Sequence, residues 1–314
     1  MGIFSSDYES AGVGIPKNAP KKKGIMRFFE LYFRKFWKLM QVNLLYTVFF
    51  IPLFMAVYAL FKIENRTVAQ AMILFCVVVF ACVVGPATAG MMKIIRNYTL
   101  EKHAFILTDF KKAFSENYSK SLVMGLIDIL AAVSVSAAIY VYPKLAKVYG
   151  NAIFVLLAIS VSVMLMIVMM NFYAFLMITA TDLSFKNILK NSFALAFIVL
   201  KKNFLTLLII LVISGVFVLL TILNLSTLLL LPFVPASTIA FIVCFNSYPV
   251  IQKYVINPYY ERNGEVNPEL DESDSDDEVL FEDKGGSEKP VEKEKNKGRG
   301  NKAGKKASKG KIIS

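Results

Sequence analysis

Residues 203–252 read NFLTLLIILVISGVFVLLTILNLSTLLLLPFVPASTIAFIVCFNSYPVIQ and contain no Asp, Glu, Lys, Arg or His. A transmembrane helix needs about 20 apolar residues to cross roughly 30 Å of hydrocarbon, so this stretch is too long for one crossing and suits two. The polar interruption Asn224-Leu225-Ser226 is the natural place for the turn between them. The stretch therefore predicts a membrane protein with an antiparallel pair of spanning helices.

The same apolar pattern recurs upstream in four further stretches. Together the stretches predict six spans, at residues 39–61, 67–92, 121–142, 150–181, 204–223 and 227–248. Five spans are the alternative, in which the segment with Pro232 and Pro235 dips into the bilayer without crossing it. The predicted fold is an all-α, polytopic transmembrane helical bundle.

Lys and Arg are distributed unevenly between the predicted loops. The first 38 residues and the loops at 93–120 and 182–203 carry eighteen, whereas the alternate loops carry four. Because basic side chains resist translocation, the richer loops are expected to be cytoplasmic. Both termini are then cytoplasmic in a multi-pass protein of the plasma membrane. The net charge of +12 mostly reflects this bias and gives no reason to expect a specific nucleic-acid partner.

The segment 1–38 is predicted to be cytoplasmic and to contain an interfacial amphipathic helix. Arg27, Glu30, Arg34 and Lys38 follow one another at spacings of three, four and four, so they share one helical stripe. The other face is apolar and aromatic, and the basic stripe suits anionic lipid headgroups. The alternative is a cytoplasmic extension of the first spanning helix.

Composition changes abruptly after Tyr260. Residues 265–283 hold ten acids and no base, and residues 284–311 hold eleven Lys or Arg against three Glu. Such a sequence cannot bury enough apolar surface to offset chain entropy. The membrane domain is therefore predicted over residues 39–260 and a disordered tail, acidic and then basic, over 261–314. Its basic end could contact anionic lipid.

One ionisable residue lies well inside a predicted span. Asp128 falls about two turns into the third span, and an acid at that depth is costly and usually faces the interior of the bundle. Asn171 in the fourth span and Asn43 in the first are its candidate neighbours in a polar intramembrane site. The alternative is that Asp128 fixes packing and that the Asn side chains form interhelical hydrogen bonds.

Small residues gather near the end of the second span. The segment Gly85-Pro86-Ala87-Thr88-Ala89-Gly90 combines them with a proline that would distort a helix. Gly85, Pro86, Ala89 and Gly90 are predicted to form a packing motif that lets a neighbouring backbone approach closely. The functional alternative is a broken helix that binds a substrate, as in transporters.

The sequence contains no recognisable catalytic, metal or cofactor motif. The three cysteines fall inside predicted spans without zinc or redox spacing, and the one histidine has no companion ligand. These residues are Cys76, Cys82, Cys244 and His103. The acids near the loops, Asp109, Glu116 and Asp182, are too scattered to predict an enzyme. No enzyme activity and no cofactor are expected.

The chain resembles the YesL-like family of bacterial integral membrane proteins, a domain of unknown function. The resemblance covers roughly residues 25–260 and depends most on the segment 85–90 after an Asn-Leu-Leu span. Its motifs are Asn43-Leu44-Leu45, Pro52, GPATAG at 85–90, Phe110–Phe114, Asn117-Tyr118, Asn191 and Lys202-Asn203-Phe204. The family has no established catalytic residues to carry over. The long charged tail departs from its usual short form.

Members of that family are often encoded near carbohydrate-uptake genes, so the resemblance implies an accessory role in sugar import. A non-enzymatic accessory or scaffold is therefore the favoured function, with the bilayer and a transport permease or a second copy as partners. A small transporter with a polar site around Asp128 is the alternative. A membrane-embedded enzyme acting on lipids is the third class.

The predicted topology is testable with reporter fusions. Fusions after Asn65, Tyr149 and Leu225 are expected to report an extracytoplasmic position. Fusions after Glu101, Lys190 and Tyr260 are expected to report a cytoplasmic one, because the basic loops stay inside. A cytoplasmic signal at Leu225 would contradict the six-span prediction.

Overall fold

The structure is a computed structural model that describes residues 24–269. Residues 1–23 and 270–314, which include most of the predicted charged tail, lie outside the described residues. The chain divides into two units, Met1–Phe36 and Trp37–Ser314.

The described part of the first unit is the beginning of helix α1 (Ile25–Val48). Phe29 and Phe33 are exposed there, and their rings stack with centroids 6.1 Å apart. They lie one turn apart on the helix and form part of the apolar face that the amphipathic pattern predicts. Because α1 continues without a break to Val48, the segment predicted to be interfacial and the start of the predicted first span belong to one helix.

All secondary-structure elements of the described residues are helical, so the predicted fold class is confirmed. Five helices are long and apolar enough to cross a membrane, and a sixth span is obtained if the bent pair α1 and α2 counts as one. The elements are α1, α2 (Ile51–Lys62), α3 (Arg66–Thr99), α4 (Ile106–Glu116), α5 (Tyr118–Tyr149), α6 (Ile153–Ala180), α7 (Phe185–Ile198), α8 (Leu200–Leu223), a 3₁₀ helix (Leu225–Leu230), α9 (Pro235–Ile251), a π-helical turn (Gln252–Ile256) and α10 (Asn257–Asn263).

The ambiguity between five and six spans lies in the first span and not, as expected, near Pro232 and Pro235. The chain bends by 51° between α1 and α2. Pro52, in the first turn of α2, has no backbone N–H to continue the helix from α1. The break places the ring of Phe49 5.5 Å from those of Phe110 and Phe114 of α4. The bend therefore contributes to packing.

The last span also differs from the expected 227–248. Helix α8 ends at Leu223, and the Asn224 side chain accepts a hydrogen bond from the Ser226 amide at 3.0 Å. A 3₁₀ helix then leads to α9, which starts only at Pro235, where a proline suits the first turn of a helix. This helix contains a long buried stretch and qualifies as a span together with the π-helical turn and α10, which continue it to Asn263.

Burial is concentrated at one end of the long helices, which we call the base: residues 85–125, 172–207 and 240–256. None of the most apolar 18-residue stretch of α6 is buried, whereas every residue from Phe172 to Ala180 is. In α3 likewise, burial is sparse before Gly85 and nearly continuous after it. The base is therefore the packed core of the unit.

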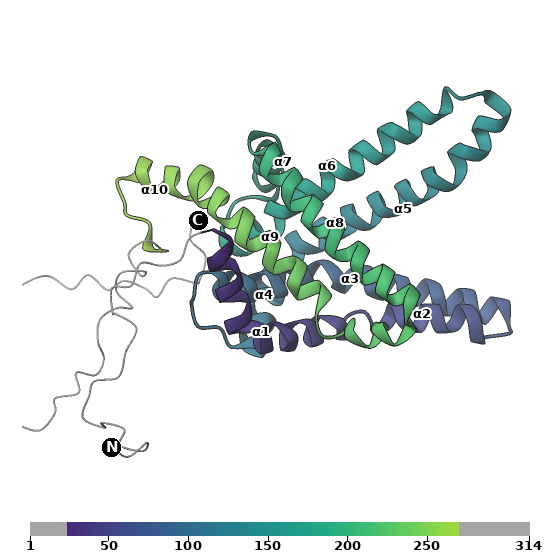
Figure 1. The fold of residues 1–314 in the computed structure, drawn as a ribbon, viewed down its shortest axis with the longest axis horizontal. Coiled ribbons are helices and arrows are strands. Elements are labelled where there is room, and N and C mark those ends of the chain that lie inside the picture. The colour runs from purple at the N-terminus through teal and green to yellow at the C-terminus, as the bar shows by residue number, and fades with distance from the viewer. Residues whose placement is uncertain (1–23, 270–314) are drawn as a thin grey trace, which may run out of the picture. The chain divides into compact units, whose positions relative to one another are not determined.

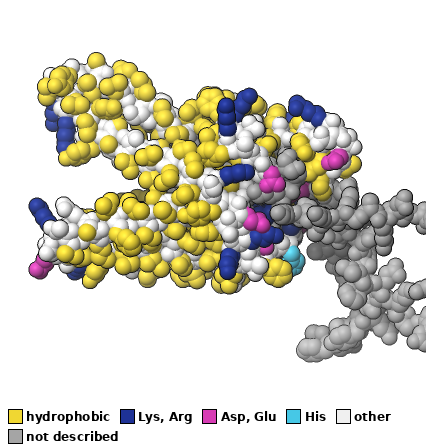
Figure 2. Space-filling model, turned by 180° about the vertical axis from the view of Figure 1, so that it is seen from behind, with side chains coloured by type: hydrophobic (Ala, Val, Ile, Leu, Met, Phe, Trp, Pro, Cys, Tyr) yellow, Lys and Arg dark blue, Asp and Glu magenta, His cyan; other side chains and the backbone are white. Residues whose placement is uncertain are grey.

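The other halves of these helices form two apolar hairpins, which we call the arms. The first arm is residues 51–84 of α2 and α3, and the second is residues 126–171 of α5 and α6. Figure 1 shows the two arms diverging from the region where α3 and α5 meet. In Figure 2 hydrophobic side chains cover both, with a hollow between the two lobes. The arms thus depend on the base for their positions.

Helices α3 and α5 make a backbone contact in the base. A Cβ atom added to Gly85 would lie 2.1 Å from the carbonyl oxygen of Ser121, and one added to Gly125 would lie 2.8 Å from the Cα atom of Gly85. Pro86 is buried beside the contact, yet α3 remains helical through it from Arg66 to Thr99. The alternative of a broken helix in this segment is therefore wrong.

The rest of the small-residue segment contacts other neighbouring helices. Gly90 faces α4, because an added Cβ would lie 3.0 Å from the ring of Phe110. Ala89 is fully buried, and Thr88 shares a hydrogen bond of 3.0 Å with the Tyr46 hydroxyl of α1. The segment therefore packs against several elements at once.

Replacing Gly85 by Ala is expected to destabilise the protein by about 1–3 kcal/mol or more, because the new methyl group meets backbone that cannot rotate away. Thermal unfolding in detergent, followed by loss of soluble monomer, measures the effect. Gly215→Ala in α8 is the matched control, since an added Cβ there meets nothing within 4 Å. Equal stability of the two variants would contradict the close contact.

Candidate functional site

Asp128 and Asn171 form a direct pair. The Asn171 side-chain amide on α6 donates a hydrogen bond of 2.6 Å to the Asp128 carboxyl group on α5. Both side chains are half-buried, and the single side-chain oxygen of Asn171 is buried without a hydrogen-bond partner among the described residues. The structure therefore brings together two of the three residues predicted for a polar intramembrane site.

Asn43 makes its contacts elsewhere. It is completely buried in α1, and its side-chain amide donates to the carbonyl oxygen of Leu231 at 2.9 Å. Its side-chain oxygen accepts from the amide of Ser237 at 2.8 Å. Both groups of the side chain are thus used to join α1 to the start of α9. The contact fixes the first span against the last.

Two further polar pairs join helices of the base. The Tyr173 hydroxyl donates to the side-chain oxygen of Asn203, whose amide group donates to the Ala196 carbonyl at 3.0 Å. The Asn246 amide donates to the Thr206 hydroxyl at 3.2 Å. Buried polar groups are stable in an apolar interior when they are paired in this way. These residues hold helices together.

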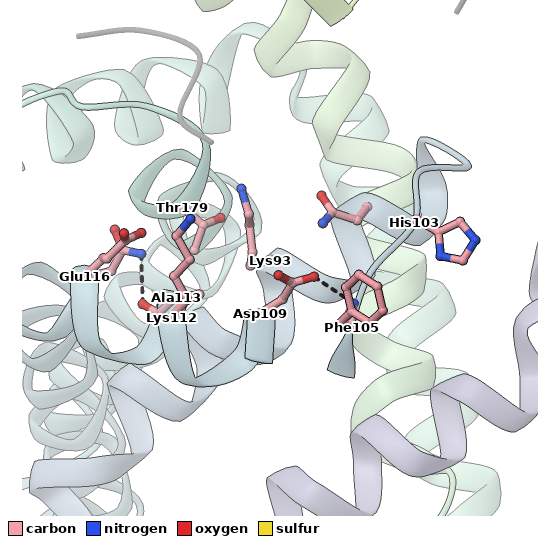
Figure 3. A pocket seen from close by; sticks show the side chains of 10 residues that line it. Lys93, His103, Phe105, Asp109, Lys112, Ala113, Glu116 and Thr179 are labelled. Carbon is pink, nitrogen blue, oxygen red and sulfur yellow. Dashed lines mark hydrogen bonds between the residues drawn. The ribbon is translucent and has the colours of Figure 1, made fainter. Parts of the chain in front are cut away.

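A polar pocket lies between α3, α4 and the end of α6 in the base, with a volume of about 280 Å³. Figure 3 shows Lys93 and Lys112 between Glu116 on one side and Asp109 on the other, with His103 beyond Phe105. Its lining residues are Lys93, Asn97, His103, Phe105, Asp109, Lys112, Ala113, Glu116, Asn117 and Thr179. The pocket thus combines cations, carboxylates and amides.

Helix α4 positions most of this lining. Asp109, Lys112, Ala113 and Glu116 recur at spacings of three, one and three, so they share one helical face. The Asp109 carboxylate accepts a hydrogen bond of 2.8 Å from the Phe105 amide and thereby satisfies one free N–H at the start of α4. The opposite face, with Phe110, packs into the base. Amphipathicity therefore directs the charged residues into the pocket.

Asn117 closes the end of α4. Its side-chain amide donates to the Ala113 carbonyl at 2.9 Å, whereas its side-chain oxygen is buried and has no hydrogen-bond partner among the described residues. An unpaired buried acceptor costs about 1–3 kcal/mol. A ligand with an N–H or O–H group could satisfy it.

The size and charge of the pocket limit what it can hold. Ligand sites for drug-sized molecules usually measure about 300–1,000 Å³, so this one suits a small polar group such as a headgroup or an ion. No group of three or more His, Cys, Asp or Glu able to hold a metal occurs between residues 24 and 269. The pocket shows no nucleophile with an adjacent base of the kind that acyl transfer needs.

The structure corrects one expectation about the acids. Asp109 and Glu116 lie in the same pocket and are not scattered, because seven residues correspond to two turns of α4. Asp182 is not among the lining residues. His103, for which no companion ligand was expected, is exposed and lines the same pocket.

Sequence reasoning missed this pocket because it attributed the basic loop at 93–120 to topology alone. A usable signal was present in the helical spacing of Asp109, Lys112 and Glu116. The contribution of Thr179 had no such signal, since it comes from a helix far away in the sequence, and Lys93 comes from α3 and not from α4.

The fold defines the class of protein: a helical, multi-pass membrane protein. A family model described as "Protein of unknown function, DUF624" matches residues 39–139, from the second part of α1 into α5. The chain is similar to that family over this segment, which includes the Gly85 contact and most of the pocket. No curated protein and no solved structure matches the chain.

The Asp128–Asn171 pair can be tested by a double-mutant cycle. Asp128→Leu and Asn171→Leu are expected to show a coupling of about 1 kcal/mol in unfolding free energy, as interhelical hydrogen bonds in membranes do. The control cycle combines Asn43→Leu with Asn171→Leu and is expected to be additive within about 0.5 kcal/mol. Additivity in the first cycle would show that the pair does not form.

Proposed function

We propose that the protein is a non-enzymatic accessory or scaffold of a bacterial plasma membrane that holds another membrane protein. The partner we propose is a transport permease for carbohydrates, as the resemblance to the YesL-like family implies. Both termini and the base are then cytoplasmic. The observation that best supports this proposal is the divergence of the two arms.

The arms expose apolar surface that residues 24–269 do not cover. Val133 and Tyr140 of the second arm and Phe75 of the first are more than 60% exposed. Such surface suits hydrocarbon, but lipid acyl chains would also have to fill the hollow between the arms. Helices of a partner protein fill such a space with better van der Waals packing.

One face of the second arm is suited to helix docking. Ala132 and Ser136 of α5 are exposed and lie one turn apart, so the backbone is accessible there. Small residues at this spacing let another helix approach closely. The surface therefore supports a protein partner as well as lipid.

The paired polar groups support a scaffold more than a transporter. Asn43, Asn203 and Asn246 use their side chains in interhelical hydrogen bonds. A transporter normally gathers such groups around a substrate at the middle of the membrane. In this protein they join separate pairs of helices.

A small transporter is the second candidate, and the Asp128–Asn171 pair favours it. The pair is half-buried in the membrane part of the chain. If Asp128 conducts protons, Asp128→Asn abolishes any transport-linked growth phenotype, because an amide cannot release a proton. Unchanged growth of this variant on every sugar tested would assign Asp128 to packing.

Affinity purification in mild detergent, with identification of co-purifying proteins, tests the scaffold proposal. A transport permease is expected to co-purify with the wild type. Ser136→Trp is expected to reduce its recovery at least tenfold, because the bulky ring prevents close approach of a partner helix.

Leu130→Trp is the matched control, since it places the same ring on the same helix where a large exposed side chain already stands. Its recovery of the permease is expected to equal that of the wild type. Purification of the wild type without any permease would contradict the proposed partner. Equal loss from both variants would contradict the proposed surface.

A further inference from the structure

The last described residues fold back onto the base. Helix α10 ends at Gly264, which adopts the left-handed conformation with φ 67°. Asn267 is then buried, and its side-chain amide donates to the side-chain oxygen of Asn257 at 2.9 Å. Its own side-chain oxygen accepts from the Glu269 amide at 3.0 Å. These bonds hold the segment in place and direct Glu269 toward α9.

Glu269, which belongs to the tail expected to be disordered, is inserted into the base. Its side chain is only 4% exposed. One carboxylate oxygen accepts hydrogen bonds from the Tyr248 hydroxyl at 2.7 Å and the Gln252 amide at 3.1 Å. The other oxygen lies 3.8 Å from the Lys102 ammonium group. Glu269 is thus bound like a ligand, by groups from α9 and from the loop before α4.

Arg96 also contacts Tyr248. Its guanidinium carbon is 5.5 Å from the centre of the Tyr248 ring, within the range of a cation–π contact. The side chain is only 3% exposed, and its Nε and Nη1 groups have no hydrogen-bond partner among the described residues. Burying a charged group without partners is costly. A buried cation that contacts the same tyrosine as the Glu269 carboxylate therefore has two donors without an acceptor among these residues.

We propose that the side chains of Arg96, Lys102, Tyr248 and Gln252 form a binding site for a phosphate group. The Glu269 carboxylate occupies this site as an intramolecular competitor. The two oxygens of the carboxylate are already used by Tyr248, Gln252 and Lys102. A phosphate group carries more oxygens, and the planar guanidinium fork matches them in geometry and charge. It would satisfy the donors of Arg96 that the carboxylate leaves unpaired.

The tethering of Glu269 makes the site self-inhibited. A group attached to the same chain competes at an effective concentration in the millimolar range. An external phosphate group therefore binds only when it displaces Glu269, or when the segment leaves the base. The phosphate group could belong to an anionic lipid headgroup or to a soluble phosphate. This site is independent of the arms on which the scaffold proposal depends.

Binding of two probes to the full-length protein in detergent tests the proposal. The probes are dihexanoyl phosphatidic acid and inorganic phosphate, with dihexanoyl phosphatidylcholine as the lipid control, and thermal shift or calorimetry measures the affinity. Glu269→Ala is expected to raise the affinity for at least one phosphate probe about tenfold, because the internal competitor is removed. Glu265→Ala, an exposed acid on the same segment, is expected to leave it unchanged.

Variants of Arg96 provide the second part of the test. In the Glu269→Ala background, Arg96→Gln is expected to abolish the gain, and Arg96→Lys to retain only part of it because Lys lacks the fork. Binding of phosphatidic acid alone would identify a lipid headgroup as the source, and binding of both probes would establish the shared phosphate chemistry. Unchanged affinity for both probes in Glu269→Ala, or a full gain that persists in Arg96→Gln, would overturn the proposal.

Discussion

The contact between Gly85 and the Ser121–Gly125 backbone is the constraint on which the rest of the structure depends. Helix α3 is central in the second unit, since it packs against α2, α4, α5, α6 and α9. Its close approach to α5 is possible only because neither glycine carries a Cβ atom. In a membrane, where burial of apolar surface drives association weakly, such backbone contact supplies much of the packing. The base forms around it.

The arms follow from the same constraint. The close contact between α3 and α5 is made at Gly85 and Gly125, and beyond it the two helices belong to different arms, whose exposed apolar side chains suit a hydrocarbon environment. Each arm is packed mainly within its own hairpin and is positioned by the base. A compact base with divergent arms provides surface for a partner without requiring a cavity inside the chain.

Polar side chains occur in two different environments in the protein. Inside the helices, polar side chains are paired one to one, as Asp128 is with Asn171 and Asn43 is with the start of α9. At the base, by contrast, the charged residues of α3 and α4 line a pocket, and Arg96 and the inserted Glu269 both contact Tyr248. The chemistry most able to recognise a ligand is therefore at the ends of the helices and not at their centres.

The sequence by itself determined the helical membrane class, the approximate spans and the glycine-rich packing segment. These features depend on local composition, because apolar length and small-residue spacing are read along a single helix. Only the tertiary structure decided that the chain bends between α1 and α2, that Asn43 contacts α9 instead of Asp128, and that Thr179 shares a pocket with α4. It also decided that Glu269 lies at the base, although the acidic composition around it predicts disorder. Apart from the bend, which follows locally from Pro52, these outcomes depend on contacts between residues far apart in the chain, which composition and periodicity do not encode.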